Sequence, residues 1–310
     1  MRYHSMDMQV IINQMAVLFI LLALGYIAAK VKLLTADTGK SMSKIVLHIL
    51  IPCTVLNSAV NGNITITGRD AIIFLLLALL SFLLAHLIAI PAARALGGDK
   101  GDHGLYGFMA AYGNVAFVGF PVAYAIFGAS SAFYVTLYNI PFALLAFSAG
   151  IIMISKRSED VKAKALLNPA FICGLIAIAI YFTGYKAPYF IAEPVRIINS
   201  ATTPCSMLVI GASLAQVPLK NVFSEWRIYP VTLLKLIVIP VVVWLIFSRF
   251  LSDDLMLGVL VVLSGMPTAA TAAMVALEYG GNGRIASSGV FMTTLVSCAS
   301  IPLLVYVLLR

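Results

Sequence analysis

The chain has 310 residues, of which 62% are hydrophobic and 10% carry a charge. Soluble domains average roughly 25% charged residues, so this composition excludes a soluble domain and indicates an all-α polytopic membrane protein. The net charge of +8 comes without a basic run interleaved with aromatic residues, which argues against nucleic-acid binding. The four cysteines lie in apolar stretches without metal-ligand spacing, so we expect buried free thiols, no metal and no cofactor.

Ten apolar stretches predict ten transmembrane helices. In chain order they cover residues 10–29, 43–60, 71–93, 104–127, 132–154, 169–184, 195–215, 229–250, 255–279 and 285–309. A basic polar segment separates the first five from the last five. We therefore predict a first five-helix repeat over 1–154, a cytoplasmic linker over 155–168 and a second five-helix repeat over 169–310.

Lysine and arginine are distributed unequally between the two sides of the membrane. With the amino terminus outside, thirteen of them fall in inner loops and six on the outer side. Because cytoplasmic loops carry the excess of positive residues, both termini are expected outside.

The fourth stretch is interrupted at its centre. It carries Gly113, Asn114, Gly119 and Pro121 in the sequence Gly-Asn-Val-Ala-Phe-Val-Gly-Phe-Pro. Proline removes a backbone donor and clashes with the preceding turn. A broken helix inside the bilayer is tolerated mainly where it lines a cavity, and transporters use such breaks as binding sites. A proline kink packed against neighbouring helices is the alternative.

The ninth stretch carries a similar break, from Ser264 to Thr271, with Pro267 at its centre. Proline suits the first turn of a helix, so we expect Pro121 and Pro267 to begin second half-helices. Such helix starts present free N–H groups and the positive end of the dipole, which suit a carboxylate. Asn114 can bind a substrate or hold unwound backbone.

The two halves of the chain share short patterns at a nearly constant offset. The matched pairs are Pro52-Cys53-Thr54 with Pro204-Cys205-Ser206, the pattern from His86 to Pro91 with that from Lys235 to Pro240, and Gly119-Phe120-Pro121 with Gly265-Met266-Pro267. A unit of five helices is odd, so the second copy enters the membrane from the opposite side. This arrangement predicts an inverted repeat in which broken helices 4 and 9 cross near the midplane.

Three titratable residues lie inside the predicted helices, namely His48, His86 and Lys235. Ionisable groups inside the membrane mark functional sites by default, so these three are candidates for proton coupling. The alternatives are snorkelling to the interface or a buried hydrogen bond. Neither break contains Asp or Glu, which makes sodium coupling less favoured.

The motifs resemble those of the auxin efflux carrier family, which includes plant PIN carriers and bacterial malate and malonate permeases. The resemblance is carried by residues 113–121, Met266-Pro267-Thr268-Ala269-Ala270, Glu278 to Ser287, and the pattern Thr293-Thr294-Leu295 with Pro302. It implies a ten-helix fold related to bile-acid sodium symporters, with scaffold helices 1, 2, 6 and 7, which are often dimeric, and transport helices 3–5 and 8–10. The short linker, unlike that of plant carriers, implies a bacterial inner-membrane protein.

We therefore predict a secondary transporter of a small organic anion, a mono- or dicarboxylate such as malate or malonate, working as an elevator within the lipid bilayer. The resemblance implies that Thr54, Asn57 and Ser206 face the substrate. The breaks supply the other candidates, which are Gly113, Asn114, Phe117, Gly119, Pro121, Ser264, Gly265, Pro267, Thr268 and Thr271. The alternatives are a sodium-coupled symporter, a non-transporting sensor, and an intramembrane enzyme, which would need motifs such as HExxH that the sequence lacks.

Overall fold

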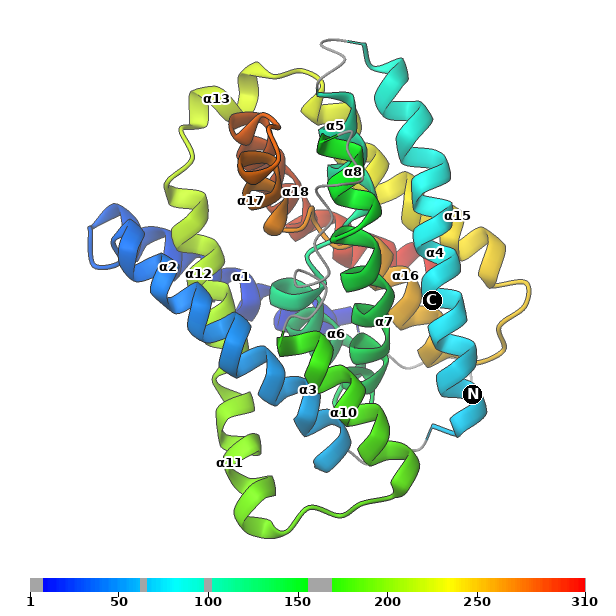
Figure 1. The fold of residues 1–310 in the computed structure, drawn as a ribbon. Coiled ribbons are helices and arrows are strands. Elements are labelled where there is room, and N and C mark those ends of the chain that lie inside the picture. Colours follow the sequence, from blue (N-terminus) through cyan, green and yellow to red (C-terminus); the bar gives the residue numbers. More distant parts are fainter. Residues whose placement is uncertain (1–7, 62–65, 98–101, 156–168, 310) are drawn as a thin grey trace.

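The computed structural model describes residues 8–61, 66–97, 102–155 and 169–309, and the regular elements in these ranges are helices (Figure 1). Apart from Ser155, the predicted linker lies outside the described residues. Seven helical segments are long and apolar enough to cross a membrane: Ile12–Lys30, Ala36–Val60, Gly68–Ala95, Ser131–Ser155, Tyr189–Ala215, Ile228–Phe247 and Gly283–Leu308. Three apolar helices are shorter: Val115–Phe127, Phe171–Thr183 and Asp254–Ser264. The chain is thus an all-helical polytopic membrane protein, as its composition predicts.

The helices of the first half are α1 (Met8–Lys30), α2 (Ala36–Ile45), η1 (Val46–Leu50), α3 (Ile51–Val60), α4 (Gly68–Ala95), α5 (His103–Ala111), η2 (Val115–Gly119), α6 (Phe120–Phe127), α7 (Ser131–Ala146) and α8 (Ala149–Ser155). Those of the second half are α10 (Pro169–Thr183), α11 (Tyr189–Ser200), α12 (Thr202–Ala215), α13 (Leu219–Ser224), α14 (Ile228–Leu233), η4 (Leu234–Val238), α15 (Ile239–Phe247), α16 (Asp254–Ser264), α17 (Thr271–Glu278) and α18 (Gly283–Leu308).

Several helices begin where a polar side chain caps them. Thr67 and Asp70 form a reciprocal capping box at the start of α4. Asp253 accepts a hydrogen bond from the backbone of Met256 at the start of α16, and Asn282 caps α18 in the same way. The second membrane segment begins at residue 36 rather than 43, since Thr35 caps the polar helix α2 that precedes its apolar part.

Three wide helical turns precede prolines inside membrane segments. The π-helical elements η1, η2 and η4 lie directly before Pro52, Pro121 and Pro240. In each, the residue before the proline donates its N–H to the carbonyl five residues earlier. A proline ring clashes with the carbonyl four residues earlier, and a π-turn relieves that clash without ending the helix.

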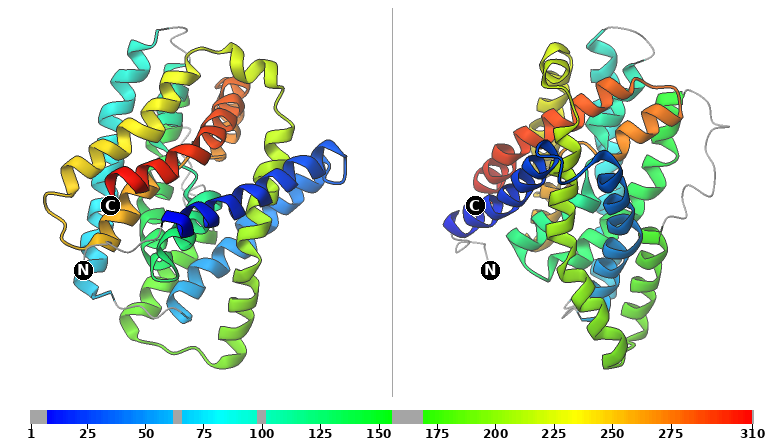
Figure 2. Two further views of the ribbon diagram at one scale, coloured as in Figure 1. Left: turned by 180° about the vertical axis from the view of Figure 1, so that it is seen from behind. Right: turned by 90° about the vertical axis from the view of Figure 1, so that its left-hand side faces the viewer.

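The helices pack in two groups. In the first group α12 packs on α1 and α2, and α3 packs on α10 and α11. Figure 2 shows α1 crossing α12, and the approach is close because Gly25 and Gly211 lie at the crossing, where a Cβ would overlap the partner's backbone. The second group joins α4 to α5 and α7, α16 to α7 and α15, and α18 to α14 and α17.

The outer faces of these groups are apolar. Leu87 of α4 is 73% exposed and Ile20 of α1 is 60% exposed, which a soluble protein would bury in a core. In a bilayer such faces contact lipid, so these apolar side chains are exposed to lipid rather than to water. The four cysteines are free but only half-buried, which corrects the expectation of buried thiols.

Candidate functional site

The first break separates α5 from η2. Helix α5 ends at Ala111, and Tyr112 is extended, with φ −106° and ψ 117°. Asn114 then turns the chain, because the N–H of Val115 donates to the carbonyl of Gly113 over 2.9 Å in an inverse γ-turn. The Asn114 side chain caps the next helix by accepting from the N–H of Phe117 over 3.3 Å.

The second break runs from Gly265 to Ala270, between α16 and α17. It lies antiparallel to the first break, and Gly113 pairs with Thr268 as an isolated β-bridge. The N–H of Asn114 donates to the carbonyl of Pro267 over 2.6 Å, and that of Ala269 donates to the carbonyl of Tyr112 over 2.9 Å. Each unwound segment therefore satisfies backbone groups of the other, as a low-dielectric membrane interior requires.

Thr268 fastens the crossing to the helices around it. Its hydroxyl donates to the carbonyl of Met109 over 2.9 Å, and its N–H donates to the hydroxyl of Thr293 over 3.0 Å. Thr268 is fully buried, so both bonds are protected from competition. The second break is thereby held to α5 and α18.

Lys235 stands on one side of the crossing. Its side chain is 1% exposed, and its ammonium donates to the carbonyl of Ser264 over 3.1 Å and to that of Ala111 over 3.5 Å. These are the last residues of α16 and α5, where the helix dipoles are negative. Lys235 thus serves as a shared cationic cap for the two helices that enter the crossing.

The second halves of the broken helices do not begin at the prolines, which corrects that expectation. They begin at Val115 and Thr271, several residues before Pro121 and after Pro267. The Asn114 cap starts the helix at Val115, and Pro121 is then accommodated by a π-turn. Pro267 cannot start a helix because its carbonyl is held by the crossing.

A cavity of about 410 Å³ lies beside the crossing. Asn114, Phe117, Thr271 and His48 are the sequence-predicted residues on its wall. The remaining lining residues are Leu47, Ile51, Val115, Ala116, Asn139, Phe142, Ala143, Phe147, Pro169, Phe171, Ala269, Ala270, Met274, Val275, Glu278 and Tyr279. The wall therefore comes from both packing groups and from both half-helix starts, and it is mostly apolar with a few polar groups, as small-molecule sites are.

The polar groups of the cavity include unused hydrogen-bonding capacity. The hydroxyl of Thr271 is buried without a partner in the described part of the chain. Asn139 donates one amide hydrogen to the carbonyl of Val135 over 3.0 Å, and an amide has a second. The cavity wall contains Glu278 but neither lysine nor arginine among the described residues, so an anion would rely on helix starts and neutral donors.

Asn139 and Glu278 were missed as site residues by sequence reasoning. Asn139 lies two residues before Pro141 in an otherwise apolar stretch, and a polar residue there is a recognisable signal. Glu278 is the acidic residue nearest the second break in sequence. It lies several residues beyond the break along the chain, so the sequence alone did not indicate that it lines the cavity.

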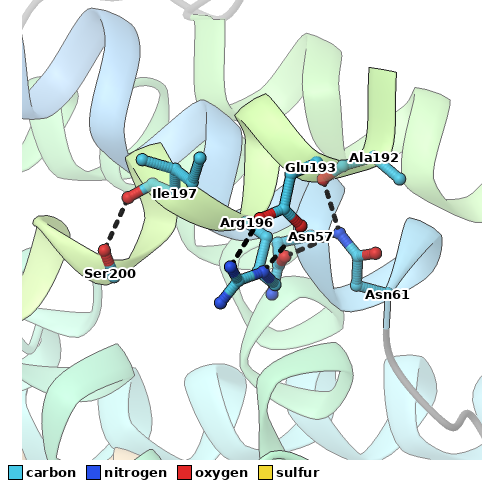
Figure 3. Close-up of polar contacts among 7 residues, drawn as sticks. All are labelled: Asn57, Asn61, Ala192, Glu193, Arg196, Ile197 and Ser200. Carbon is cyan, nitrogen blue, oxygen red and sulfur yellow. Dashed lines mark hydrogen bonds and ion pairs between the residues drawn. The ribbon is translucent and has the colours of Figure 1, made fainter. Parts of the chain in front are cut away.

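Three candidates implied by the resemblance do not line the cavity. The hydroxyls of Thr54 and Thr202 lie 2.8 Å apart in a helix contact, and Ser206 is fully buried. Figure 3 shows Asn57 beside Asn61 at the contact of α3 with α11, where the Asn61 amide donates to Asn57 over 3.0 Å and to the carbonyl of Ala192 over 2.9 Å. These side chains serve helix packing in this structure.

The other candidates lie off the cavity wall, in or next to the two breaks. They are Gly113, Gly119, Pro121, Ser264, Gly265, Pro267 and Thr268. Lys235 and His86 also lie off the wall. Glycine at 113 allows the close approach, because a Cβ there would lie in tight contact, 3.1 Å from the Cβ of Met266 and 3.3 Å from the ammonium of Lys235.

Comparison with known proteins places the chain among membrane transport proteins. The family described as membrane transport protein matches residues 10–305. An uncharacterized transporter of Methanocaldococcus jannaschii is 28% identical over 309 residues, which covers 95% of this chain and 97% of the relative. A Rhizobium meliloti protein named "Putative malonate transporter" is 26% identical over 219 residues, covering 66% of this chain and 67% of the relative. The resemblance drawn from the motifs is confirmed, and the chain belongs to the membrane transport protein family.

Proposed function

We propose that the protein is a secondary transporter of a small organic anion, a mono- or dicarboxylate such as malate or malonate. The observation that carries this proposal is the cavity of about 410 Å³ at the crossing, with Asn114 and two half-helix starts on its wall. Membership of a transport family and similarity to a relative named for malonate support the substrate class.

The cavity suits one carboxylate and a short carbon skeleton. The helices that start at Val115 and Thr271 direct positive dipole ends toward it, and the Asn114 amide and Thr271 hydroxyl can donate to carboxylate oxygens. Phe117 and Met274 provide apolar wall for the carbon atoms. Charge-assisted hydrogen bonds of this kind are about twice as strong as neutral ones.

The proposed mechanism is an elevator built from ten membrane segments in two inverted repeats. The scaffold comprises α1, α2–α3, α10 and α11–α12, and the transport domain comprises α4–α8 and α14–α18. Their contacts within each group support this division, and the cavity lies between them, with Leu47, His48 and Ile51 on the scaffold side. Sliding of one group against the other would expose the cavity to alternate sides. A homodimer through the scaffold helices is part of this proposal.

The proposed orientation has both termini outside in a bacterial inner membrane, from the lysine and arginine distribution. Glu278, on the cavity wall, then lies at the inner end of its segment, and on this basis we assign the cavity to an inward-facing arrangement.

For coupling, the position of Lys235 argues against sodium. Its ammonium already neutralises the carbonyl ends of α5 and α16, where a bound cation would otherwise find oxygen ligands. We therefore favour proton coupling, with His48, His86 and Lys235 as the candidates, over the sodium-coupled alternative. A sodium requirement for uptake would reverse this preference.

The test is uptake of radiolabelled malonate and malate into proteoliposomes, with empty liposomes as the control. We expect saturable uptake by the wild-type protein, and an Asn114→Ala variant with lower affinity or rate. Binding without flux would support a non-transporting sensor, and chemical conversion of the substrate would support an intramembrane enzyme. Either result, or no binding of any carboxylate, contradicts the proposal.

A further inference from the structure

His86 lies on α4 in a chain of three short contacts. Its Nδ1 is 2.7 Å from the carbonyl oxygen of Phe82, and its Nε2 is 2.8 Å from the hydroxyl of Tyr112. The same hydroxyl donates to the carbonyl of Leu145 on α7 over 2.7 Å. The chain therefore joins α4, the first break and α7.

The donor and acceptor roles of these atoms determine the protonation state of His86. The carbonyl oxygens of Phe82 and Leu145 can only accept, so Nδ1 must carry a hydrogen and Tyr112 must donate its only hydroxyl hydrogen to Leu145. The phenol oxygen is then an acceptor toward the imidazole, and Nε2 must carry a hydrogen as well. All three contacts are satisfied together only when His86 is an imidazolium.

Loss of that proton forces a rearrangement of the chain. A neutral His86 that keeps its hydrogen on Nδ1 has an acceptor at Nε2, so two acceptors compete for the one hydrogen of Tyr112. Either the Nε2 contact or the Leu145 contact then loses its hydrogen. Leaving a polar group unpaired in the interior costs about 1–3 kcal/mol, which is enough to bias a two-state arrangement.

Tyr112 connects this chain to the anion cavity. Its backbone carbonyl accepts the hydrogen bond from Ala269 at the crossing. Its ring packs edge-on against Phe142 of the cavity wall, with ring centroids 6.1 Å apart. A change in the Tyr112 hydroxyl contact therefore acts on residues that hold the crossing and line the cavity.

We propose that His86 is the proton-binding site of this transporter and that one proton bound there accompanies each anion. The inference rests on the proposed function and adds a proton as co-substrate. Only an N–H bond forms, on Nε2, with a proton taken from water on one side of the membrane and released to water on the other. The imidazolium offsets one negative charge of the anion during the crossing.

The surroundings of His86 agree with this assignment. From the first break, Tyr112 meets the ring edge-on at 5.1 Å, and from α7 the nearby titratable side chain is Tyr138, which packs on Phe82 with centroids 4.8 Å apart. Of the other helices packed on α4, α15 has no titratable residue, and α16 has only Asp254, at its first position. No carboxylate among the described residues pairs with His86, so no fixed counter-charge holds the proton on it.

Among the described residues, neither of the other two candidates contacts a group that can both donate and accept a hydrogen bond. His48 is exposed, and its contact within the described ranges runs from Nδ1 to the carbonyl of Lys44 over 3.0 Å. The ammonium of Lys235 contacts only carbonyl oxygens among the described residues. Gain or loss of one proton on His48 or Lys235 therefore does not redirect a neighbouring hydrogen bond, whereas a proton on His86 redirects that of the Tyr112 hydroxyl.

The test compares His86→Gln, Tyr112→Phe and His48→Gln in proteoliposomes containing a pH-sensitive dye. Two quantities are measured: exchange of labelled malonate across the membrane, and protons moved per anion during net uptake. We expect about one proton per anion in the wild type and close to none in His86→Gln, because glutamine does not titrate. Tyr112→Phe is expected to lower the ratio, and both variants should retain exchange.

Each outcome decides the matter. An unchanged ratio in His86→Gln, or loss of proton movement in His48→Gln instead, overturns the proposal. Loss of exchange together with proton movement in His86→Gln would assign the histidine to folding or anion binding and also overturns it. Wild-type exchange without proton movement refutes this inference alone, whereas absence of wild-type exchange refutes the proposed function.

Discussion

Asn114 combines two tasks that substitutions can separate. Its side-chain oxygen caps the helix that begins at Val115, and its amide lies on the cavity wall, where it can donate to an anion. Alanine removes both functions. Serine is as good a cap as asparagine but lacks the amide donor, so Asn114→Ser retains the first task and loses the second.

The expected magnitudes differ for the two variants. Losing the cap costs about 1 kcal/mol, and the capping bond at 3.3 Å is long, so we expect the lower part of the usual range. A hydrogen bond to a charged carboxylate contributes about 1.5–3 kcal/mol, which corresponds to roughly a 10- to 100-fold loss of affinity. Asn114→Ser should therefore bind the anion about 10- to 100-fold more weakly while unfolding at the wild-type temperature. Asn114→Ala should show the same weakening and lower thermal stability.

The assay is paired for each purified variant. Thermal unfolding is measured without ligand, and anion affinity is measured as the concentration dependence of uptake or of thermal stabilisation, which follows the ratio of ligand concentration to dissociation constant. If Asn114→Ser binds malonate as tightly as the wild type, the amide does not contact the anion. The role of Asn114 would then be limited to the backbone of the crossing.

Three further predictions address the crossing, the mechanism and the scaffold. Thr268→Val, which leaves a carbonyl of α5 without its donor, should lower the free energy of unfolding by about 1–3 kcal/mol, measured by denaturant titration. In a background without the native cysteines, Ser58→Cys with Thr136→Cys should form a disulfide between α3 and α7, because the two hydroxyls lie 3.4 Å apart. Uptake should stop on oxidation and return on reduction, and full uptake by the cross-linked protein would contradict an elevator. Gly211→Ala should destabilise the protein by about 1–3 kcal/mol because the added methyl overlaps the backbone of α1, whereas Gly174→Ala, whose nearest neighbour would be 3.8 Å away, should be neutral.

Seven membrane segments, and the interruptions before η2 and before α17, could be predicted because both follow from local chemistry. Apolar length defines a crossing, and glycine, asparagine and proline together disrupt a helix regardless of the rest of the fold. The seventh segment begins at Tyr189, earlier than predicted. Its first helix, α11, is amphipathic, and a search for continuous apolar residues does not detect such a helix. Helix ends of this kind depend on the water interface, which composition does not locate.

The site was predicted only in part, because its wall is assembled by packing. Asn114 and Thr271 were accessible to sequence reasoning because each adjoins a break. Asn139 lies on another helix, and nothing in its own stretch indicates which cavity it faces. Thr54 and Ser206 lie away from this cavity, since small polar residues inside a membrane segment also serve close helix contacts.

The arrangement of charges at the crossing bears on the sign of the ligand. The helices that enter it, α5 and α16, end with their negative dipole ends at Lys235, so those ends are already neutralised. The helices that leave it begin at Val115 and Thr271, and their positive ends face the cavity without an acidic side chain at either start. A cation in the cavity would meet two positive helix ends and, beyond the crossing, a buried lysine, with Glu278 the acidic side chain on the described wall. These helix ends support the proposed carboxylate ligand, and substitution of Lys235 by a neutral residue should weaken the preference for an anion by exposing the carbonyl ends to other cations.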